Sequence, residues 1–361
     1  MFKYKVLVVD DSLFMRKWIS DMIEANSMFE VADTARNGEE AVEKVKRLKP
    51  DAVTLDVEMP VMNGLEALKR IMAECPVPVI MLSSRTGTGT AETLQALELG
   101  AVDFVMKPSG PVSLDLHKIK QLLFEKLQIA VKTNVNKLAL PPPAVRQLGS
   151  LKSPDASPVP KPKANGAFAV ENMVAIGTST GGPRALQHVL THLPGDFPAP
   201  LVIVQHMPPK FTKSLADRLD SMCEIRVKEA AEGDVLLNGC AYIAPGDWHM
   251  EVHQEEGIYR IRLTKDHPRG SHRPSVDTLF ESLVPLLELR RYAVLMTGMG
   301  SDGAKGMKAL KESGARAVIA ESSETCVVYG MPRAAVELGG ATEQLPLYKI
   351  ASRLIEQVGR D

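Results

Sequence analysis

Polar residues stand at the ends of short apolar runs in the first third of the chain. These residues are Asp10-Asp11, Asp56, Ser83 and Lys107. Grouped carboxylates repel one another unless a cation joins them, and Mg²⁺ prefers oxygen ligands and bridges to phosphoryl groups. We therefore expect Mg²⁺ at Asp10, Asp11 and Asp56. Asp56 would attack a phosphoryl donor, and Ser83 and Lys107 would hold the phosphate that results.

A second set of candidate residues lies in the last half of the chain. Ser179 is the serine of a G-x-S-x-G sequence, in which small neighbours allow a sharp turn from a strand into a helix. His206 and Asp302 each follow another apolar run. The three types suit acyl transfer: the serine attacks a carbonyl, the histidine moves the proton and the aspartate orients the imidazole. Backbone N–H groups around Met299, in a glycine-rich loop, could form an oxyanion hole.

Simpler explanations exist for these same residues. The glycine-rich turn could hold a nucleotide phosphate, although GTSTGGPR lacks the lysine of a Walker motif. Asp302 could cap the helix predicted after it. His249, with Asp247 nearby, competes as base and orienting acid, but it ranks second because the preceding strand ends at Pro245. The polar loop TKDHPRGSHRPS contains His267, Arg269, His272 and Arg273. We interpret it first as a solvated rim, with contact to the substrate as the alternative.

Alternating strands and helices would position the first set of residues. The predicted strands are 5–10, 30–35, 52–56, 78–82 and 102–106, and predicted helices cover 13–25, 38–49 and a segment from Leu65. Such alternation predicts a five-stranded parallel (βα)5 sheet over residues 1–128. Because ligands bind beyond the carboxyl ends of such strands, the polar residues should meet at one edge.

Residues 168–361 show a second α/β pattern. The predicted strands are 172–178, 200–206, 240–245, 292–298 and 315–320, with a hairpin over 249–264 and helices over 183–193, 275–289 and 302–314. This pattern predicts a doubly wound, mostly parallel sheet, with Ser179, His206 and Asp302 again at strand ends. Residues 129–167 are rich in proline, lysine and serine, which predicts a semi-rigid linker between the two domains.

The bulk composition narrows the classes of partner. A net charge of -1 gives no indication of a nucleic-acid partner. The apolar runs are too short to span a bilayer, and the N-terminus does not resemble a secretory signal. The four cysteines are scattered, which favours reduced thiols over a structural zinc site. We therefore expect a cytoplasmic protein without membrane insertion.

The motifs of the first part resemble the receiver domain of response regulators over residues 1–125. Asp10-Asp11, Asp56, Ser83 and Lys107-Pro108 match that family in order, and Phe104 occupies its aromatic switch position. The resemblance implies Mg²⁺-dependent phosphorylation of Asp56. A phosphoryl group adds nearly two negative charges, enough to reposition Ser83 and shift a surface.

The motifs GTSTGGP, VQHMP, YIAPGDWH, HRPSVDTLF and LMTGMGSDGA resemble the catalytic domain of chemotaxis protein-glutamate methylesterases. The resemblance implies hydrolysis of glutamate γ-methyl esters on cytoplasmic helices of methyl-accepting chemoreceptors, with methanol released, and deamidation of receptor glutamines. It implies a chemotaxis histidine kinase as phosphodonor and no cofactor for ester hydrolysis. It makes Ser179, His206 and Asp302 the triad. Met299, with Thr180, falls on the oxyanion side.

Regulation and two rival functions follow from this domain order. The unphosphorylated receiver is expected to lie over the Ser179 crevice, and phosphorylation of Asp56 to weaken that contact. One rival is a receiver that drives a scaffold with an inert serine centre. The other is a DNA-binding output, which the absence of a basic face and of a helix-turn-helix pattern disfavours.

Overall fold

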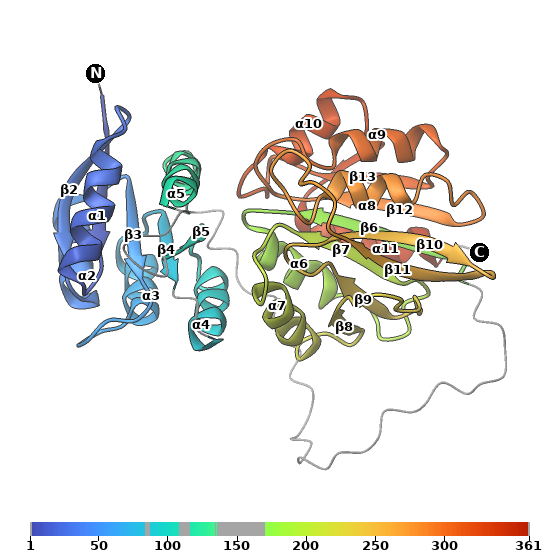
Figure 1. Cartoon of the computed structure of the whole chain (residues 1–361), viewed down its shortest axis with the longest axis horizontal. Coiled ribbons are helices and arrows are strands. Elements are labelled where there is room, and N and C mark those ends of the chain that lie inside the picture. The colour runs from blue at the N-terminus through green and yellow to red at the C-terminus, as the bar shows by residue number, and fades with distance from the viewer. Residues whose placement is uncertain (1, 84–86, 108–115, 134, 136–169, 360–361) are drawn as a thin grey trace, which may run out of the picture.

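The computed structural model describes residues 2–83, 87–107, 116–133, 135 and 170–359. Figure 1 shows two α/β bodies side by side, one built by the first third of the chain and the other by its second half. Most of the predicted linker 129–167, and Pro108, lie outside the described residues. No helix in the described part is both long and apolar enough to cross a membrane.

The first body is the predicted parallel sheet with its helices. Its strands are β1 (Tyr4–Val9), β2 (Phe29–Ala35), β3 (Ala52–Asp56), β4 (Val79–Ser83) and β5 (Asp103–Met106). Its helices are α1 (Leu13–Glu24), α2 (Gly38–Leu48), α3 (Gly64–Glu74), α4 (Gly87–Glu98) and α5 (Leu116–Ala130). The strands pair in the order β2-β1-β3-β4-β5, and every pairing is parallel. The predicted receiver-type architecture is confirmed.

The start of α3 explains the Asn63-Gly64 turn. Asn63 caps the helix, because its side chain accepts a hydrogen bond from the N–H of Glu66. A Cβ added at Gly64 would lie 2.0 Å from the carbonyl oxygen of Asp56. Only glycine therefore allows α3 to begin this close to the end of β3. The turn consequently fixes the backbone that carries Asp56.

The second body is a larger parallel sheet. Its strands are β6 (Asn172–Thr178), β7 (Leu201–Gln205), β8 (Arg226–Glu229), β9 (Cys240–Ile243), β12 (Arg290–Leu295), β13 (Ala317–Glu321) and β14 (Glu343–Leu345), and β10 (His249–Glu255) with β11 (Ile258–Thr264) forms an antiparallel hairpin. Its helices are α6 (Gly182–Leu190), α7 (Phe211–Asp220), α8 (Val276–Ser282), α9 (Ala304–Glu312), α10 (Met331–Glu337) and α11 (Leu347–Val358). The large sheet has the order β14-β13-β12-β6-β7-β9-β8. The predicted doubly wound fold is confirmed.

Sequence patterns gave one helix the wrong length and missed other elements. The helix expected over 275–289 ends at Ser282, shortly before Pro285, whose nitrogen has no hydrogen to donate. Patterns in the second half did not indicate β8, β14, α7, α10 or α11. The strands that carry the candidate site were predicted within a few residues.

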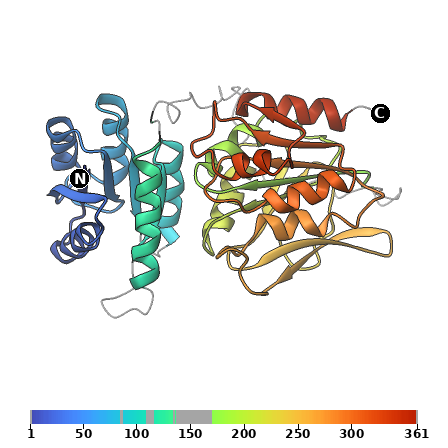
Figure 2. The same cartoon turned by 90° about the horizontal axis from the view of Figure 1, so that it is seen from above.

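The order of the large sheet creates the crevice for a site. β6 lies between β12 and β7, so the chain leaves β6 toward one side and returns on the other. Helices α6, α7 and α11 pack with one apolar cluster, while α8, α9, α10 and the hairpin pack with another. Figure 2 shows these two layers from above. A crevice at the carboxyl ends of β6, β7 and β12 is where such folds bind ligands.

The two bodies meet through the α4–β5–α5 side of the first one (Figures 1 and 2). Phe104 on β5 stacks on Phe211 on α7, with ring centroids 4.5 Å apart. Arg218 on α7 forms an ion pair with both carboxylate oxygens of Glu98 on α4. Thr180, next to Ser179, donates a hydrogen bond to Asp103 on β5. The receiver thus contacts the residue beside the candidate nucleophile.

Candidate active site and phosphoacceptor site

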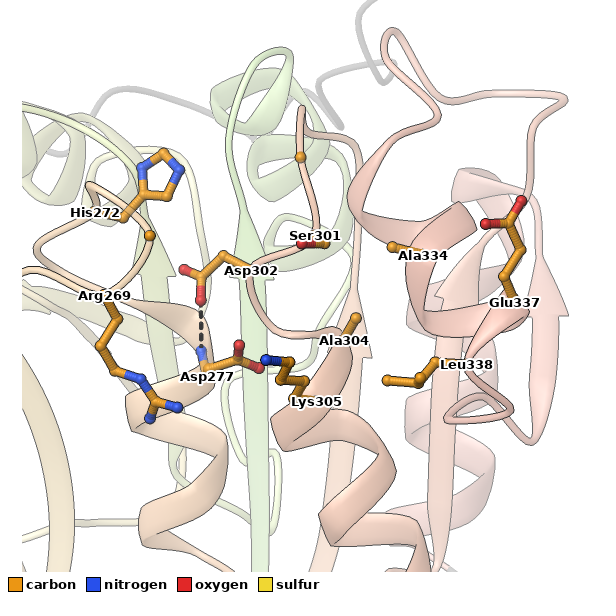
Figure 3. A pocket seen from close by; sticks show the side chains of 12 residues that line it. Arg269, His272, Asp277, Ser301, Asp302, Ala304, Lys305, Ala334, Glu337 and Leu338 are labelled. Carbon is orange, nitrogen blue, oxygen red and sulfur yellow. Dashed lines mark hydrogen bonds between the residues drawn. The ribbon is translucent and has the colours of Figure 1, made fainter.

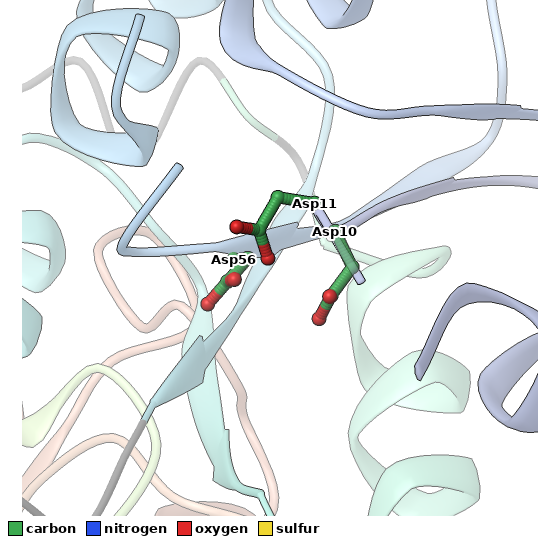
Figure 4. Close-up of side chains that lie close together, drawn as sticks. All are labelled: Asp10, Asp11 and Asp56. Atoms are coloured by element: carbon green, nitrogen blue, oxygen red, sulfur yellow. The ribbon is translucent and has the colours of Figure 1, made fainter. Parts of the chain in front are cut away.

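Three carboxylates meet at the edge of the first sheet, as Figure 4 shows. Ligand oxygens of Asp10, Asp11 and Asp56 lie within 4.8 Å of one another. Asp10 and Asp56 are buried, whereas Asp11 is exposed at a cavity of about 450 Å³ that Asp56 and Lys107 also line. Oxygen donors grouped beside an open cavity fit a hard divalent cation such as Mg²⁺.

Lys107 joins two of these carboxylates. Its Nζ lies 2.7 Å from Asp10 Oδ2 and 2.6 Å from Asp56 Oδ2. Burial, together with the neighbouring charges of Asp10 and Asp11, raises the pKa of Asp56 to about 6 against the opposing effect of Lys107. The pocket therefore holds more negative charge than Lys107 alone offsets. A metal cation here would stabilise the ionised Asp56.

The two predicted switch residues lie on the side of the sheet that faces the second body. Thr93 on α4 donates a hydrogen bond to Ser83 Oγ at 2.7 Å, and both side chains are fully buried. The Phe104 ring is 4% exposed because it packs on Phe211. Ser83 and Phe104 thus connect the sheet edge to α4 and α7.

His206 and Asp302 meet in the crevice of the second sheet. The Nε2 atom of His206 lies 2.8 Å from Asp302 Oδ2, and both side chains are less than a tenth exposed. The other ring nitrogen, Nδ1, is buried without a hydrogen-bond partner among the described residues. Ser179 stands one strand away, directly after β6. The structure therefore brings together all three strand ends that carry the predicted triad.

Asp302 is held by more than His206. Its Oδ1 accepts from Ser275 Oγ at 2.8 Å and from the N–H of Asp277 at 3.0 Å, and its Oδ2 accepts from the N–H of Val276 at 2.7 Å. Figure 3 shows the bond to Asp277. Although burial opposes it, hydrogen bonding to His206 and these N–H groups holds the pKa of Asp302 well below its usual range. Asp302 is a fixed, ionised acceptor.

These contacts contradict the simpler explanation of Asp302 as a cap of the next helix. Gly303 stands at the cap position of α9 and provides no side-chain hydrogen bond. Asp302 instead binds the first N–H groups of α8, a helix that lies earlier in the chain. Spacing along the sequence could not reveal this, because only the tertiary fold brings α8 to the loop.

The turn at Ser179 is fastened on two sides. The N–H of Ser179 donates to Thr297 O at 3.0 Å, and a Cβ at Gly298 would lie 2.8 Å from the Cβ of Ser179. The Gln205 side chain donates to the carbonyls of Ser179 at 3.0 Å and His206 at 3.3 Å. Gln205 is a site residue that the sequence motifs do not include, although a glutamine inside the apolar run before His206 indicates a buried polar role.

The two residues expected on the oxyanion side differ in their surroundings. Met299 is 36% exposed on the loop after β12, and the neighbouring carbonyl of Gly298 accepts from the N–H groups of Gly330 and Met331. Thr180 is buried, and its hydroxyl donates to Asp103 of the receiver. The carbonyl of Thr180 accepts from Thr297 Oγ1 at 2.9 Å. The hydroxyl of Thr180 is therefore engaged at the interface.

The competing pair His249 and Asp247 has structural partners. His249 Nδ1 accepts from the N–H of Ser275 at 3.2 Å, and Nε2 lies 3.2 Å from His267 O. Asp247 forms an ion pair with Arg273 at 2.6 Å. Both nitrogens of His249 are thus used to hold backbone. The second-ranked assignment of this pair as base and orienting acid has no geometric support.

The polar loop TKDHPRGSHRPS is only in part the predicted solvated rim, because one of its histidines packs on His206. His267 is exposed, but the ring of His272 stacks on that of His206 with centroids 4.0 Å apart and planes 3° apart. Burial, with the neighbouring His206, lowers the pKa of His272 to about 4. His272, Asp302 and Lys305 line a cavity of about 610 Å³ beside the crevice (Figure 3). The polar composition of the loop gave no indication that His272 stacks on His206.

Comparison with known proteins finds relatives of both domains. Residues 174–354 match the family described as CheB methylesterase, and residues 6–118 match the response regulator receiver domain. A protein-glutamate methylesterase/protein-glutamine glutaminase of Geobacillus kaustophilus is 54% identical over 98% of this chain and 99% of its own.

This chain belongs to the CheB methylesterase family.

Other members support the same assignment. The Bacillus subtilis protein of the same name is 48% identical over 99% of both chains. The crystal structure of the Thermotoga maritima CheB methylesterase catalytic domain matches with a TM-score of 0.50 and 48% identity, over 51% of this chain and 97% of that one. Family membership confirms the expectation of an ester-hydrolysing enzyme with a receiver domain.

Proposed function

We propose that this chain hydrolyses γ-methyl esters of protein glutamates by a Ser–His–Asp mechanism. One observation carries the proposal: His206 bonds Asp302 through Nε2, while Nδ1 is buried with no partner among the described residues. A buried ring nitrogen without a partner is available to exchange a proton. The activity in the names of the relatives supports the choice of substrate.

The reaction would proceed in two halves. Ser179 Oγ attacks the ester carbonyl carbon while His206 Nδ1 takes its proton, and ionised Asp302 stabilises the imidazolium. The C–O bond to methanol then breaks, and the proton on Nδ1 goes to the leaving oxygen. Water attacks the acyl-serine with His206 again as base, releasing glutamate and restoring Ser179.

The loop after β12 would stabilise the negative charge that forms on the carbonyl oxygen. Gly298 lies against Ser179, so the following N–H of Met299 is the donor we assign to the oxyanion. We also assign Thr180 to this side of the site, through its backbone, since its hydroxyl binds Asp103. A glutamine side chain fits the same chemistry with ammonia leaving. We therefore propose deamidation as a second reaction.

We propose that phosphorylation of Asp56 activates the hydrolase. Asp10, Asp11 and Asp56 would hold Mg²⁺, which neutralises charge on the incoming phosphoryl group. Ser83 and Lys107 would bind the phosphate. In the contacts described above, the unphosphorylated receiver (residues 1–128, joined through 129–167) lies against Thr180 and so restricts a bulky substrate.

A chain of contacts would carry the signal between the sites. Ser83 is tied to Thr93 on α4, and the same helix ends at Glu98, which binds Arg218. A phosphate on Asp56 that draws Ser83 toward itself would break the link to Thr93 and release Phe104 from Phe211. The interface would loosen at two points, freeing Thr180 and the crevice.

The substrates that we propose are methyl-accepting chemoreceptors, at their cytoplasmic helices, and the phosphodonor is a chemotaxis histidine kinase. Sensory adaptation is the process in which receptor demethylation would act. A cytoplasmic location follows from these partners. The choice of receptors as substrates rests on the family resemblance, whereas the proposed ester hydrolysis rests on the arrangement of Ser179, His206 and Asp302.

Methanol release from methylated receptor membranes tests the hydrolase. Full-length protein with Mg²⁺ and a small acyl phosphate should release methanol, and Ser179→Ala should reduce the rate by about 10³-fold or more. Ser352→Ala, an exposed serine on α11, is the matched control and should keep full activity. No release by the wild type, with Asp56 shown to be phosphorylated, would favour the scaffold alternative.

A truncated protein tests the regulation. A fragment beginning near Ala167 should be more active than unphosphorylated full-length protein, because the receiver contact is gone. The Thermotoga maritima catalytic domain was crystallised as a separate domain, which supports the design. Equal or lower activity of the fragment would contradict control by docking.

A further inference from the structure

His272 is partly buried against the candidate base although the proposed mechanism gives it no role. Its ring lies parallel to that of His206, 4.0 Å between centroids and 3° between planes. Stacking of this kind covers one face of His206 and leaves the ring edge free, where Nε2 meets Asp302. The contact therefore restricts tilting of the imidazole without competing for either nitrogen.

We propose that His272 is a positioning residue for the hydrolytic reaction. Its ring would hold the imidazole of His206 in the plane in which Nε2 bonds Asp302, so that Nδ1 keeps the orientation in which it would take the proton of Ser179. This inference rests on the proposed function, since it assumes that His206 moves the proton of Ser179. It assigns a role to a loop whose sequence favours a solvated rim over a contact with the site.

The turn that carries His272 is tightly built. The N–H of His272 donates to Arg269 O at 2.9 Å, and the N–H of Arg269 donates to His272 O at 3.1 Å. Between them, Gly270 has φ of 55° and Ser271 has φ of 74°. A left-handed serine costs conformational energy, so the surrounding structure must enforce this turn.

Side chains fasten the same loop to three other parts of the domain. Arg269 binds Glu281 of α8, with one bond at 2.9 Å. Arg273 binds Asp247, in the loop before β10, and also the carbonyl of Asp266 at 3.0 Å. His249 of β10 holds the backbone at both ends of the loop through its two nitrogens. An exposed rim needs no such fastening, whereas a stacked ring must be held in place.

The charge of His272 suits a positioning role. Burial and the proximity of His206 lower its pKa, so the ring is neutral at neutral pH. Asp302 is the charged group that opposes this shift. A neutral ring does not repel the positive charge that develops on His206 during proton transfer, whereas a second imidazolium would.

Substitution of the ring tests the proposal in the full-length, phosphorylated protein. His272→Ala removes the stack, His272→Phe keeps a flat ring, and His267→Ala, an exposed histidine of the same loop, is the control. For each variant we would measure kcat and KM for methanol release and the thermal unfolding midpoint. The rate of Ser179 labelling by a fluorophosphonate is measured in parallel. In that labelling Ser179 Oγ bonds phosphorus, His206 takes the proton and fluoride leaves.

The expected result is a split between kcat and KM. His272→Ala should lower kcat and the labelling rate about tenfold with KM nearly unchanged, because only the geometry of the base is disturbed. His272→Phe should recover most of both rates, and His267→Ala should match the wild type. A raised KM at constant kcat, unchanged rates in His272→Ala, or a phenylalanine variant as slow as the alanine variant would overturn the proposal.

Fluorophosphonate labelling separates this inference from the proposed substrate. Wild-type labelling at Ser179 without methanol release would reject the receptor ester as substrate, while the labelling rates of the variants would still decide the role of His272. Absence of labelling in the phosphorylated wild type would overturn both, since no activated serine would exist for His206 to serve.

Discussion

Two buried carboxylates at strand ends, Asp56 and Asp302, behave in opposite ways. Burial disfavours the ionised form of both, yet the pKa of Asp56 is raised to about 6 while that of Asp302 is lowered. Asp302 receives hydrogen bonds from His206, from Ser275 and from two backbone N–H groups. Asp56 has Lys107 on one side and two further carboxylates on the other.

The contrast teaches that surrounding donors, and not burial, decide what a strand-end carboxylate can do. The four hydrogen bonds of Asp302 fix its position and charge, which suits an acid that orients a histidine and stays ionised. Asp56 has the ammonium of Lys107 as a donor, but the carboxylates of Asp10 and Asp11 place an excess of negative charge around it. It is suited to receive a cation and then a phosphoryl group, and in the proposed reaction its own oxygen would attack phosphorus.

Replacing the fixed carboxylate should have the largest effect. Asp302→Asn keeps the shape, but its amide nitrogen donates and cannot accept the two hydrogen bonds that one carboxylate oxygen accepts, so the tautomer and orientation of His206 should be lost. We expect methanol release to fall by about 10⁴-fold, the size found for such a change in other triads. Asp266→Asn, on the exposed loop nearby, is the control. A loss below tenfold would mean that Asp302 is structural only.

Removing divalent metal should affect the phosphoacceptor site and leave the hydrolytic site unchanged. With a chelator present, the increase in methanol release produced by an acyl phosphate should disappear, a loss of about tenfold if the coupling is of ordinary size. The basal rate should not change, because only the Asp10–Asp11–Asp56 cluster fits a hard cation among the described residues. A chelator that also abolishes basal activity would place a metal in the hydrolytic step.

The two sites should also give stability opposite dependences on pH. Folding lowers the pKa of His272 to about 4. Its contribution to the free energy of unfolding is therefore complete above about pH 6.5 and is lost as pH falls toward 4. Folding raises the pKa of Asp56 to about 6, so the folded state takes up a proton and gains stability as pH falls through 6.

Thermal unfolding of metal-free protein at pH 7 and pH 4.5 measures how these two contributions change the stability of the folded protein with pH. His272→Phe should lose less stability on acidification than the wild type, and Asp56→Asn should lose more. Each difference should be about 1 kcal/mol, after allowance for partial exposure and screening. The Asp302 contribution falls in a lower pH range, below its unfolded pKa near 3.8, and does not interfere. Parallel curves for all three proteins would contradict the opposite pKa shifts.

Strand ends could be predicted from sequence, and with them most of both sites. Apolar runs ending in Asp56, Ser179 and His206 located the edges, because parallel strands bring their carboxyl ends together. The partners of Asp302 could not be predicted, since α8 reaches it only through the tertiary fold. The stacking of His272 on His206 could not be predicted for the same reason, since the polar composition of its loop favoured a solvent-exposed rim.

The contact between the bodies was the least predictable feature. Docking could be expected from the domain order, but the pairing of Glu98 with Arg218 joins two helix surfaces far apart in sequence. The sequence around each residue predicts only a charged residue on the exposed face of a helix. The periodicity of a helix identifies its buried face and does not identify the partner of an exposed one.

Breaking that ion pair should give the smallest effect and directly tests how the two sites communicate. Glu98→Gln removes the charge facing Arg218, and a half-exposed pair of this kind contributes under about 1 kcal/mol, so basal methanol release should rise about threefold. The phosphorylated rate should not change, because in the proposed mechanism phosphorylation already opens the contact. Glu74→Gln, a glutamate paired with Lys46 and Arg70 inside the receiver, is the control and should leave both rates unchanged. A lower basal rate in Glu98→Gln would mean that the docked receiver supports the hydrolase, and the link from Ser83 through α4 to the crevice would then act in the opposite direction.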